Sequence, residues 1–291
     1  MKNQKPLISV VIPSYNRANT ILQCLETVLN QSYPNIEVVI ADDGSTDETP
    51  ALFENYPDQR VRYYHYSPNM GACHARNYGA QRSRGDYIAF QDSDDYWHPD
   101  KLQKQFDYLN GKNADFVFCG MNRVSEKGSR YYFPVSGFNE DEDAITQLLL
   151  ENRVGTQTMF MRREVWEEVR FDEGFKRYQD WDFALRVAAK YELKYLPEPL
   201  VDSRVSGDSI SSAVKSVPAL VHLYERHESE FLARPQCLAR YYRRMAVRLK
   251  DVRPREAASY FKKAWRISKK PRDFISHILC FLRRPEKTRQ N

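Results

Sequence analysis

The sequence lacks a hydrophobic run of membrane-spanning length. Its apolar stretches, such as Ile8–Ile12 and Val38–Ala41, have the length of single strands. A transmembrane helix needs about 20 consecutive apolar residues. We therefore expect no transmembrane segment.

Cysteine is also scarce and unpaired in the sequence. The five cysteines are Cys24, Cys73, Cys119, Cys237 and Cys280, and none belongs to a Cys-x-x-Cys pair. An odd and scattered set excludes a disulfide framework and a zinc knuckle. We expect reduced, structural thiols in a cytosolic protein.

Several common catalytic signatures are absent as well. The chain has no Gly-x-Gly-x-x-Gly loop and no Walker-type phosphate loop, and Ser14 lies in no Gly-x-Ser-x-Gly turn. The six histidines form no His-Glu-x-x-His pair. These absences argue against dinucleotide-binding enzymes, P-loop NTPases, α/β-hydrolases and zinc proteases of that type.

The composition that remains is that of a folded globular protein. The 291 residues are 42% hydrophobic and 29% charged, which suits one large domain or one domain with an appendage. The chain has 44 Lys+Arg and 39 Asp+Glu residues. Residues 215–291 contain 20 of the basic residues and 7 of the acidic ones. Residues 1–214 therefore contain 24 basic and 32 acidic residues. This asymmetry predicts an acidic domain over residues 1–214 and a basic, helical extension over residues 215–291.

The first 120 residues alternate strand-like and helix-like segments. Short β-branched runs predict strands at residues 8–13, 36–41, 61–66, 86–90 and 115–119. Helices are predicted at about residues 19–30, from Asp47 through Phe53, at 71–83, and at 99–110 with Pro99 in the first position. This alternation is typical of the α/β class with a mainly parallel sheet.

Beyond residue 120 the pattern is looser. It predicts a strand at residues 131–135 and helices at 140–150, 163–169 and 180–190. After about residue 215 the chain is helical and basic, with a pair of helices at 240–250 and 255–267.

Polar turns follow three of the predicted parallel strands. They hold Ser14–Arg17, Asp42–Asp43 and Asp92–Asp94. In an open α/β sheet, ligands bind at the carboxyl ends of the strands. We therefore expect these turns to meet at one edge of the sheet and to form a binding site there.

The alternating acids Asp92 and Asp94 are the strongest signal in these turns. Two carboxylates in a turn can converge on one Mn²⁺ or Mg²⁺, which prefers oxygen ligands and often binds substrate phosphates as well. Such a metal would neutralise a diphosphate leaving group. The alternative is a solvated acidic turn ahead of the next helix.

Other candidate residues keep two interpretations each. A carboxylate of Asp42–Asp43 could bind a ribose or a base, or these residues could simply form a turn with Gly44. Arg76 could clamp a phosphate or lie on the surface. Asp180, in the first turn of a predicted helix, could be a catalytic carboxylate or a favourable interaction with the helix dipole.

Taken together, these segments resemble the family 2 glycosyltransferases. Six matching pieces stand in the family's order within about residues 7–212: Ile8–Arg17, Asp42–Asp47, Asn69–Gly79, Gly85–Ile88, Asp92–Asp95 and Gln179–Asp182. The resemblance implies the GT-A nucleotide-diphospho-sugar transferase fold, here with a C-terminal helical extension. It also implies an inverting transferase of the surface-polysaccharide type.

The resemblance assigns roles around the sugar donor. It implies that the nucleotide is bound by Pro13, Ser14, Tyr15, Arg17, Arg76 and Ser93, with Asp42 and Asp43 on the base or ribose. Asp92 would approach the ribose or a metal-bound water, and Asp94 would coordinate the metal. A UDP-sugar is the expected donor.

The resemblance also assigns the chemistry of transfer. Asp180 matches the second residue of the family's Glu-Asp pair, which implies a general base that takes the proton of the attacking acceptor hydroxyl. Four residues would lie in the acceptor or leaving-group region: Gln179, Trp181, Arg204 and Ser206. The expected acceptor is a glycan or a lipid-linked glycan.

Two departures from the family pattern have consequences. Gln179 stands where the family commonly has Glu, which keeps hydrogen bonding but removes a charge. In the closing segment Val201–Ser211, Ser203 replaces the family's Tyr and Ser206 replaces its His. Because that His can help to hold the metal-diphosphate, we expect weaker metal binding here.

The basic extension has three interpretations. It could be a solvated helical face, a nucleic-acid-binding surface without a recognisable module, or a site of peripheral membrane attachment. We favour the membrane because an apolar stripe lies beside a cluster of cations. The stripe is Ile275, Ile278, Leu279, Phe281 and Leu282, and the cations are Lys269, Lys270, Arg272, Arg283 and Arg284. The expected location is the cytoplasm, at the inner face of the plasma membrane.

Two other functions compete with glycosyl transfer. A nucleotidyltransferase could share the sheet and the acidic metal site, but Ser14–Arg17 does not match its Gly-rich, basic phosphate loop. A catalytically degenerate nucleotide-sugar-binding module or partner subunit would account for Gln179 and Ser206.

Overall fold

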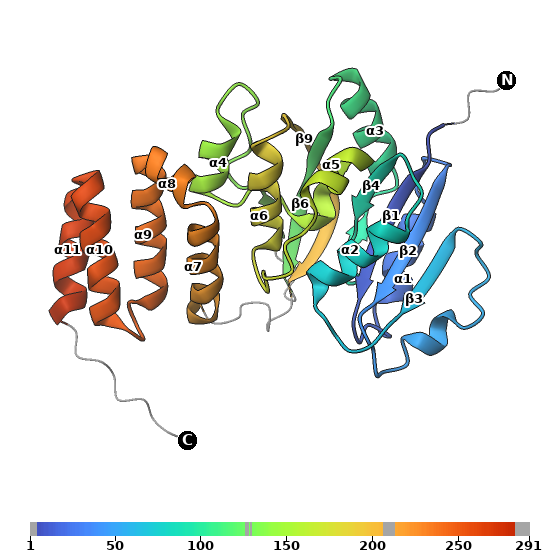
Figure 1. The fold of residues 1–291 in the computed structure, drawn as a ribbon, viewed down its shortest axis with the longest axis horizontal. Helices are drawn as coiled ribbons and strands as arrows, with labels where there is room; N and C mark the ends of the chain where they lie inside the picture. The colour runs from blue at the N-terminus through green and yellow to red at the C-terminus, as the bar shows by residue number, and fades with distance from the viewer. Residues whose placement is uncertain (1–4, 126–127, 129, 206–212, 283–291) are drawn as a thin grey trace. The chain divides into compact units, whose positions relative to one another are not determined.

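The computed structural model describes residues 5–125, 128, 130–205 and 213–282 (Figure 1). The chain divides into two compact units. The first comprises Met1–Ala144 and Asn152–Gly207, and the second comprises Ile145–Glu151 and Asp208–Asn291. The pattern of charge along the chain did not reveal that residues 145–151 group with the second unit.

The first unit contains a nine-stranded sheet. Its strands are β1 (Ile8–Ser14), β2 (Ile36–Asp42), β3 (Val61–His65), β4 (Tyr87–Phe90), β5 (Tyr96–Trp97), β6 (Phe116–Ser125), β7 (Arg130–Phe133), β8 (Met159–Arg162) and β9 (Leu193–Val205). Its helices include α1 (Ile21–Leu29), α2 (Ala72–Arg82), α3 (Lys101–Gly111), α5 (Arg163–Val169) and α6 (Gln179–Ala188).

The sheet combines a parallel part with a mixed part. Its strand order is β3-β2-β1-β4-β8-β6-β9-β5, with β7 pairing with β6. The neighbours among β3, β2, β1 and β4 run parallel, as the alternation of strands and helices predicted. From β4 onward the pairs β4–β8, β8–β6, β6–β7 and β9–β5 are antiparallel, while β6–β9 is parallel.

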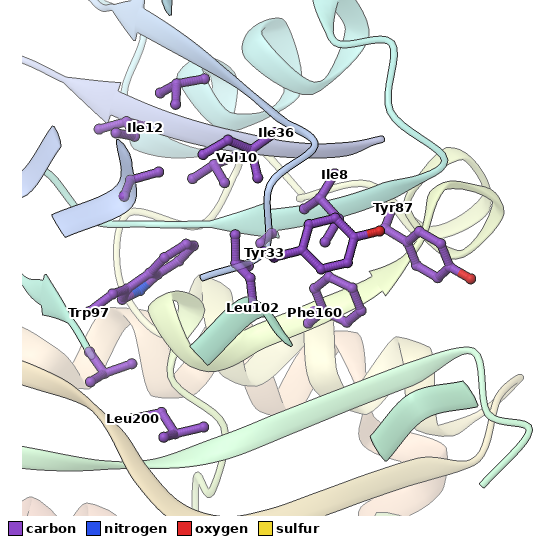
Figure 2. Close-up of a cluster of buried hydrophobic side chains, with 14 of the residues drawn as sticks. Ile8, Val10, Ile12, Tyr33, Ile36, Tyr87, Trp97, Leu102, Phe160 and Leu200 are labelled. Atoms are coloured by element: carbon purple, nitrogen blue, oxygen red, sulfur yellow. The ribbon is translucent and has the colours of Figure 1, made fainter. Parts of the chain in front are cut away.

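The central strands are buried on both faces. Every residue of β1, β2 and β4 is buried, which is why their sequences are continuous apolar runs rather than alternating ones. Figure 2 shows part of the core, where the Tyr87 ring stacks on Phe160 with centroids 5.4 Å apart. This core fixes the strands whose loops form the site.

Helix α2 packs closely on the parallel strands. A Cβ added at Gly79 would lie 2.6 Å from Val11 Cγ1 and 3.3 Å from Ala41 Cβ. Only a glycine permits this approach to β1 and β2. The contact holds the first turn of α2 near the carboxyl ends of these strands.

Two predicted helices differ in the structure. The segment through Phe53 forms only a short 3₁₀ turn, Pro50–Phe53, because the Asp47 carboxylate accepts the N–H groups of Ala18 and Thr49 and ties the segment to the loop after β1. Helix α3 begins at Lys101 rather than at Pro99. Strands β5, β8 and β9 were not predicted.

The second unit consists of helices, as predicted for the extension. They are α4 (Ala144–Leu150), whose first residue belongs to the first unit, α7 (Val217–Arg226), α8 (Glu228–Ala233), α9 (Pro235–Leu249), α10 (Pro254–Ser268) and α11 (Pro271–Leu282). The Tyr241 ring packs against Tyr224 and Phe231, with centroids 5.0 and 5.2 Å away. Arg240 and Arg244 both donate to the Leu150 carbonyl at the end of α4.

The described residues bear on two general features of the chain, its thiols and its hydrophobic helices. All five cysteines are free and buried, as expected for structural thiols. No helix in the described part of the chain combines the length and the hydropathy that crossing a bilayer requires.

Candidate functional site

The carboxyl ends of three parallel strands lie side by side. Ser14 at the end of β1 is opposite Asp42 at the end of β2, and Val11 is opposite Phe90 at the end of β4. The loops that follow line a cavity of about 500 Å³. Its lining residues are Pro13, Ser14, Tyr15, Arg17, Asp43, Asn69, Gly71, Ala72, Ala75, Arg76, Asp92, Ser93 and Asp94. The prediction that these turns meet at one edge is confirmed.

The loop after β1 is held by the loop after β2. Asn16 has a φ of +52°, its N–H donates to Ser45 Oγ, and its Oδ1 accepts the Thr46 N–H. The neighbouring residue Tyr15 is 46% exposed, and it borders the cavity. Ser14 Oγ is buried and has no hydrogen-bond partner among the described residues. This loop therefore offers the cavity an aromatic ring and a hydroxyl.

The two acids after β2 have different surroundings. The Asp42 carboxylate is buried, accepts hydrogen bonds from the Ser45 N–H and the Tyr63 hydroxyl, and does not line the cavity. The Asp43 carboxylate lines the cavity and accepts the N–H groups of Met70 and Gly71, at 2.7 and 2.6 Å. Asp43 thus holds the segment that leads into α2.

The first turn of α2 borders the cavity. Gly71, with a φ of +97°, precedes the helix, and the small side chains of Ala72 and Ala75 face the same space. Helix N-termini present free N–H groups and a partial positive charge, which favour bound anions. This wall of the cavity suits a phosphate group.

Arg76 carries a nearly buried positive charge into the cavity. The residue is 4% exposed, and its Nη2 donates to Asp92 Oδ1 at 2.7 Å. Its Nε and Nη1 have no hydrogen-bond partner among the described residues. Because a buried guanidinium is costly when its donors are unsatisfied, Arg76 is suited to an anionic ligand.

The carboxylates of Asp92 and Asp94 line the cavity together. Arg17 Nη2 lies 3.5 Å from Asp94 Oδ2. Burial and the nearby Asp92 carboxylate raise the pKa of Asp94, and Arg17 opposes that shift. The two acids therefore repel each other, as expected of a pair arranged for a cation.

The third acid of this turn points into the protein. Asp95 is 3% exposed, and its carboxylate accepts hydrogen bonds from Gln157 Nε2 and the Arg204 N–H. Burial and the charges of Asp92 and Asp94 raise the pKa of Asp95 well above its usual value. Asp95 anchors the turn from which the other two carboxylates reach the cavity.

Asp180 lies in the first turn of α6 and is half-buried. Its Oδ1 accepts the Trp181 N–H at 2.8 Å, and its carboxylate also accepts a hydrogen bond from the side chain of Asn152. Burial raises the pKa of Asp180, while these bonds and the positive charges of Arg76 and Arg123 oppose the shift. Asp180 thus lies within electrostatic reach of Arg76, which lines the cavity.

Asp180 does not line the cavity, and neither do Gln179, Trp181 and Arg204 of the predicted acceptor region. Trp181 is 3% exposed and packs edge-on against Tyr178, and Gln179 is half-buried. The Arg204 guanidinium lies over the Tyr96 ring, 4.7 Å from its centroid. Ser206 lies outside the described residues.

Some contributors had no signal of their own in the sequence. The sequence marked the segment Asn69–Gly79 as a motif but predicted no individual role for four residues that line the cavity: Asn69, Gly71, Ala72 and Ala75. Gln157 and Asn152 act over long sequence separations on Asp95 and Asp180. Nothing in their local sequence distinguishes such residues from ordinary loop residues.

Both the sequence and the fold of this chain are similar to those of known proteins. Residues 9–169 match the family model of glycosyl transferase family 2. Bacillus subtilis TuaG, named as a teichuronic acid biosynthesis glycosyltransferase, is 34% identical over 217 residues, which are 73% of this chain and 84% of TuaG. The amylovoran biosynthesis glycosyltransferase AmsB of Erwinia amylovora is 31% identical over 206 residues, covering 67% of this chain and 68% of AmsB.

Other relatives are longer than this chain. An uncharacterized glycosyltransferase of Rickettsia felis is 32% identical over 201 residues, which are 69% of this chain but 33% of that protein. The chain therefore spans about a third of the length of that relative.

Two solved structures share the fold. S. aureus TarS 1-349 in complex with UDP-GlcNAc superposes with a TM-score of 0.70 at 19% identity, covering 94% of this chain and 89% of that one. Mannosyltransferase PcManGT from Pyrobaculum calidifontis, in complex with GDP-Man and Mn²⁺, gives a TM-score of 0.62 at 18% identity, covering 94% and 79%.

Proposed function

Because the chain belongs to glycosyl transferase family 2, we propose that it moves a sugar from a nucleotide-diphosphate donor to a hydroxyl of a glycan or lipid-linked acceptor. Its fold is the GT-A fold, as the sequence predicted. The relatives named for teichuronic acid and amylovoran biosynthesis favour a pathway of surface polysaccharide synthesis. The complex of TarS with UDP-GlcNAc favours a UDP-sugar donor.

The observation that carries this proposal is the cavity at the carboxyl edge of the sheet. It brings together three carboxylates, a nearly buried arginine with unsatisfied donors, and the first turn of a helix. Arg76 and the N-terminus of α2 suit the diphosphate, and Tyr15 offers a ring for the base. Of the two acids at the end of β2, Asp43 lines the cavity, whereas the Asp42 carboxylate is buried and accepts the Ser45 N–H and the Tyr63 hydroxyl.

A divalent cation fits the chemistry of this cavity. Asp92 and Asp94 provide oxygen donors that repel each other, which a cation would relieve. Within the described residues there is no group of three or more His, Cys, Asp or Glu side chains that could hold a metal. Asp94 and Asp92 would therefore hold Mn²⁺ or Mg²⁺ together with donor phosphates, and the metal would neutralise the departing nucleoside diphosphate.

The proposed chemistry is a single displacement with inversion at the anomeric carbon. Asp180 takes the proton from the acceptor hydroxyl as that oxygen attacks. Its carboxylate is fixed by the Trp181 N–H and by Asn152, so little reorientation is needed at the moment of transfer. Gln179 places a neutral neighbour beside the base, so Asp180 is not repelled in its ionised form.

A degenerate nucleotide-sugar-binding module is the second candidate. Gln179 in place of the family's Glu, and Ser206 in place of its His, favour it. The cavity would then bind a donor without turnover. Turnover by the purified protein that Asp180→Asn abolishes decides for the enzyme.

We also propose that the second unit attaches to an anionic membrane surface. Helix α11 exposes a set of large apolar side chains: Phe274, Ile275, Ile278, Leu279, Phe281 and Leu282. Lys269 and Lys270 precede this helix, and Arg272 lies in its first turn. Arg283 and Arg284 lie outside the described residues. A cavity of about 350 Å³ in this unit is lined by the cation Lys250 together with the apolar side chains of Val247 and Phe261. Cations beside an apolar face suit anionic lipids.

Neutralising Lys269 and Lys270 to glutamine should weaken binding to phosphatidylglycerol vesicles about 30-fold, since each cation near the surface contributes about 1 kcal/mol. Co-sedimentation of the full chain with phosphatidylglycerol and with pure phosphatidylcholine vesicles measures this. Neutralising the exposed lysines Lys112 and Lys176 of the first unit is the matched control. Equal binding to both kinds of vesicle, or no loss in the Lys269/Lys270 variant, would refute the membrane surface.

A further inference from the structure

The second unit contains a cavity of its own, with a volume of about 350 Å³. It is lined by residues between 243 and 250, by Phe261 of α10 and by residues of α11, and it shares no lining residue with the cavity at the edge of the sheet. The three helices α9, α10 and α11 are neighbours in this unit (Figure 1). Cavities of about 300–1,000 Å³ bind small ligands when mostly apolar walls carry a few polar groups.

The apolar part of this cavity has buried and exposed members. Phe261 and Cys280 are each 5% exposed, whereas Val247 and Leu279 are 48% and 58% exposed. The buried pair forms a floor, and the exposed pair forms a rim. Apolar side chains exposed together around a cavity gain free energy when another apolar group covers them. A hydrocarbon chain therefore suits both the floor and the rim.

The charged part of the lining is positive. Three cations, Arg243, Lys250 and Arg272, stand against the single acid Asp273, which leaves a net charge of +2. Asp273 is 1% exposed, and its two carboxylate oxygens accept hydrogen bonds from Arg243 Nε and Nη2 at 2.6 and 2.5 Å. Because this pair satisfies the acid, the exposed Lys250 and Arg272 are left to attract an anion from solution.

We propose that this cavity binds one anionic phospholipid, with the phosphate at Lys250 and Arg272 and an acyl chain against Phe261 and Cys280. The inference rests on the proposed attachment of the second unit to an anionic membrane, and it names the single lipid that the unit binds there. Leu279 belongs both to this cavity and to the exposed apolar face of α11, which places the cavity beside the face that would meet the bilayer. A phospholipid satisfies both parts of the lining at once.

The test is calorimetry of the full chain with dihexanoyl phosphatidylglycerol below its critical micelle concentration, which offers the lipid without a bilayer. One molecule should bind per chain. Dihexanoyl phosphatidylcholine has the same chains without a net charge, and it should bind about tenfold more weakly. Glycerol 3-phosphate has the phosphate without the chains. It should bind at least about 100-fold more weakly, since each buried methylene contributes about fourfold in affinity.

Variants of the lining separate the two parts of the site. Lys250→Gln combined with Arg272→Gln should raise the Kd of dihexanoyl phosphatidylglycerol about 30-fold, because each cation near the phosphate contributes about fivefold. Ser276→Phe places a ring in the cavity and should weaken binding at least about tenfold by a clash with the chain. Lys262→Gln combined with Arg266→Gln is the matched control, because these exposed cations of α10 do not line the cavity. Its Kd should equal that of the wild type.

Three results would overturn the proposal. The first is an unchanged Kd in the Lys250/Arg272 variant, and the second is equal affinity for the two dihexanoyl lipids. The third is a concentration-dependent dimer, seen by sedimentation velocity, that Ser276→Phe abolishes, because a second copy of the chain would then cover the cavity. All the substituted side chains are at least partly exposed, so the variants should fold with the melting temperature of the wild type.

Co-sedimentation with phosphatidylglycerol vesicles separates failure of this site from failure of the membrane attachment. If the chain binds these vesicles but not the dihexanoyl lipid, the membrane surface stands and the single-lipid site is lost. If it binds neither, the attachment fails, and the lipid site fails with it.

Discussion

Replacement of Asp180 by asparagine is expected to lower turnover about 10²–10⁴-fold, the contribution of a positioned general base. Asparagine has the same size and can still accept the Trp181 N–H, but it cannot take a proton. Asp180 does not line the cavity proposed for the donor. Nucleotide affinity measured by calorimetry should therefore stay the same while kcat falls.

Asp182→Asn is the matched control on the same helix. Asp182 is fully buried, and its Oδ2 accepts hydrogen bonds from Arg186 Nε and Nη2 at 2.9 and 2.6 Å. Its replacement should cost about 3 kcal/mol in unfolding free energy, because it leaves a charge without its partner. The folded fraction should keep its turnover. Equal kcat in Asp180→Asn and wild type would remove Asp180 from the chemistry.

Asp94→Asn should abolish the metal dependence of donor binding. The variant keeps an oxygen in place but removes the charge that faces the cation, so the Kd of the nucleoside diphosphate with Mn²⁺ should rise at least about 100-fold. Its affinity in chelator should be unchanged. The fold should be no less stable, because burial and Asp92 already disfavour the Asp94 carboxylate.

A carboxylate outside the cavity provides the comparison. Asp100 is exposed and precedes α3 without a side-chain capping bond. Asp100→Asn should leave both the Mn²⁺-dependent affinity and the turnover at their wild-type values. If Asp94→Asn still binds the nucleotide more tightly with Mn²⁺ than with chelator, Asp94 does not hold the metal.

The part of the fold near the N-terminus was predictable because its signals are local. Buried parallel strands are continuous apolar runs, and each is followed by a polar turn or a helix. Because β2, β1 and β4 are neighbours in the parallel part of the sheet, Ser14, Asp43 and Asp92 come together at its carboxyl edge. The strand pattern alone therefore predicted where the cavity lies.

The mixed half of the sheet could not be predicted in the same way. Strand β9 pairs with β6 in parallel, with irregular register near Gly120, and it pairs with β5 in antiparallel fashion. Such pairings depend on contacts between distant segments rather than on the periodicity of one segment. The two-residue strand β5 is too short to leave a pattern.

The sequence also could not predict which side chains of these turns point into the cavity and which point into the protein. The sequence singled out Asp92 and Asp94, but Asp95 is the buried anchor because of its bonds to Gln157 and the Arg204 N–H, which the sequence does not reveal. Likewise, the sequence placed Asp42 and Asp43 together on the nucleotide. The Tyr63 hydroxyl and the Ser45 N–H engage Asp42 inside the protein.

Calorimetric titration of UDP, GDP and dTDP into the purified protein, with Mn²⁺ and with chelator, tests the central claim most directly. The account predicts that one nucleoside diphosphate, UDP, binds in a metal-dependent manner, more tightly with Mn²⁺ than with chelator. Absence of binding by all three in a folded sample would contradict the assignment of the cavity as a sugar-donor site.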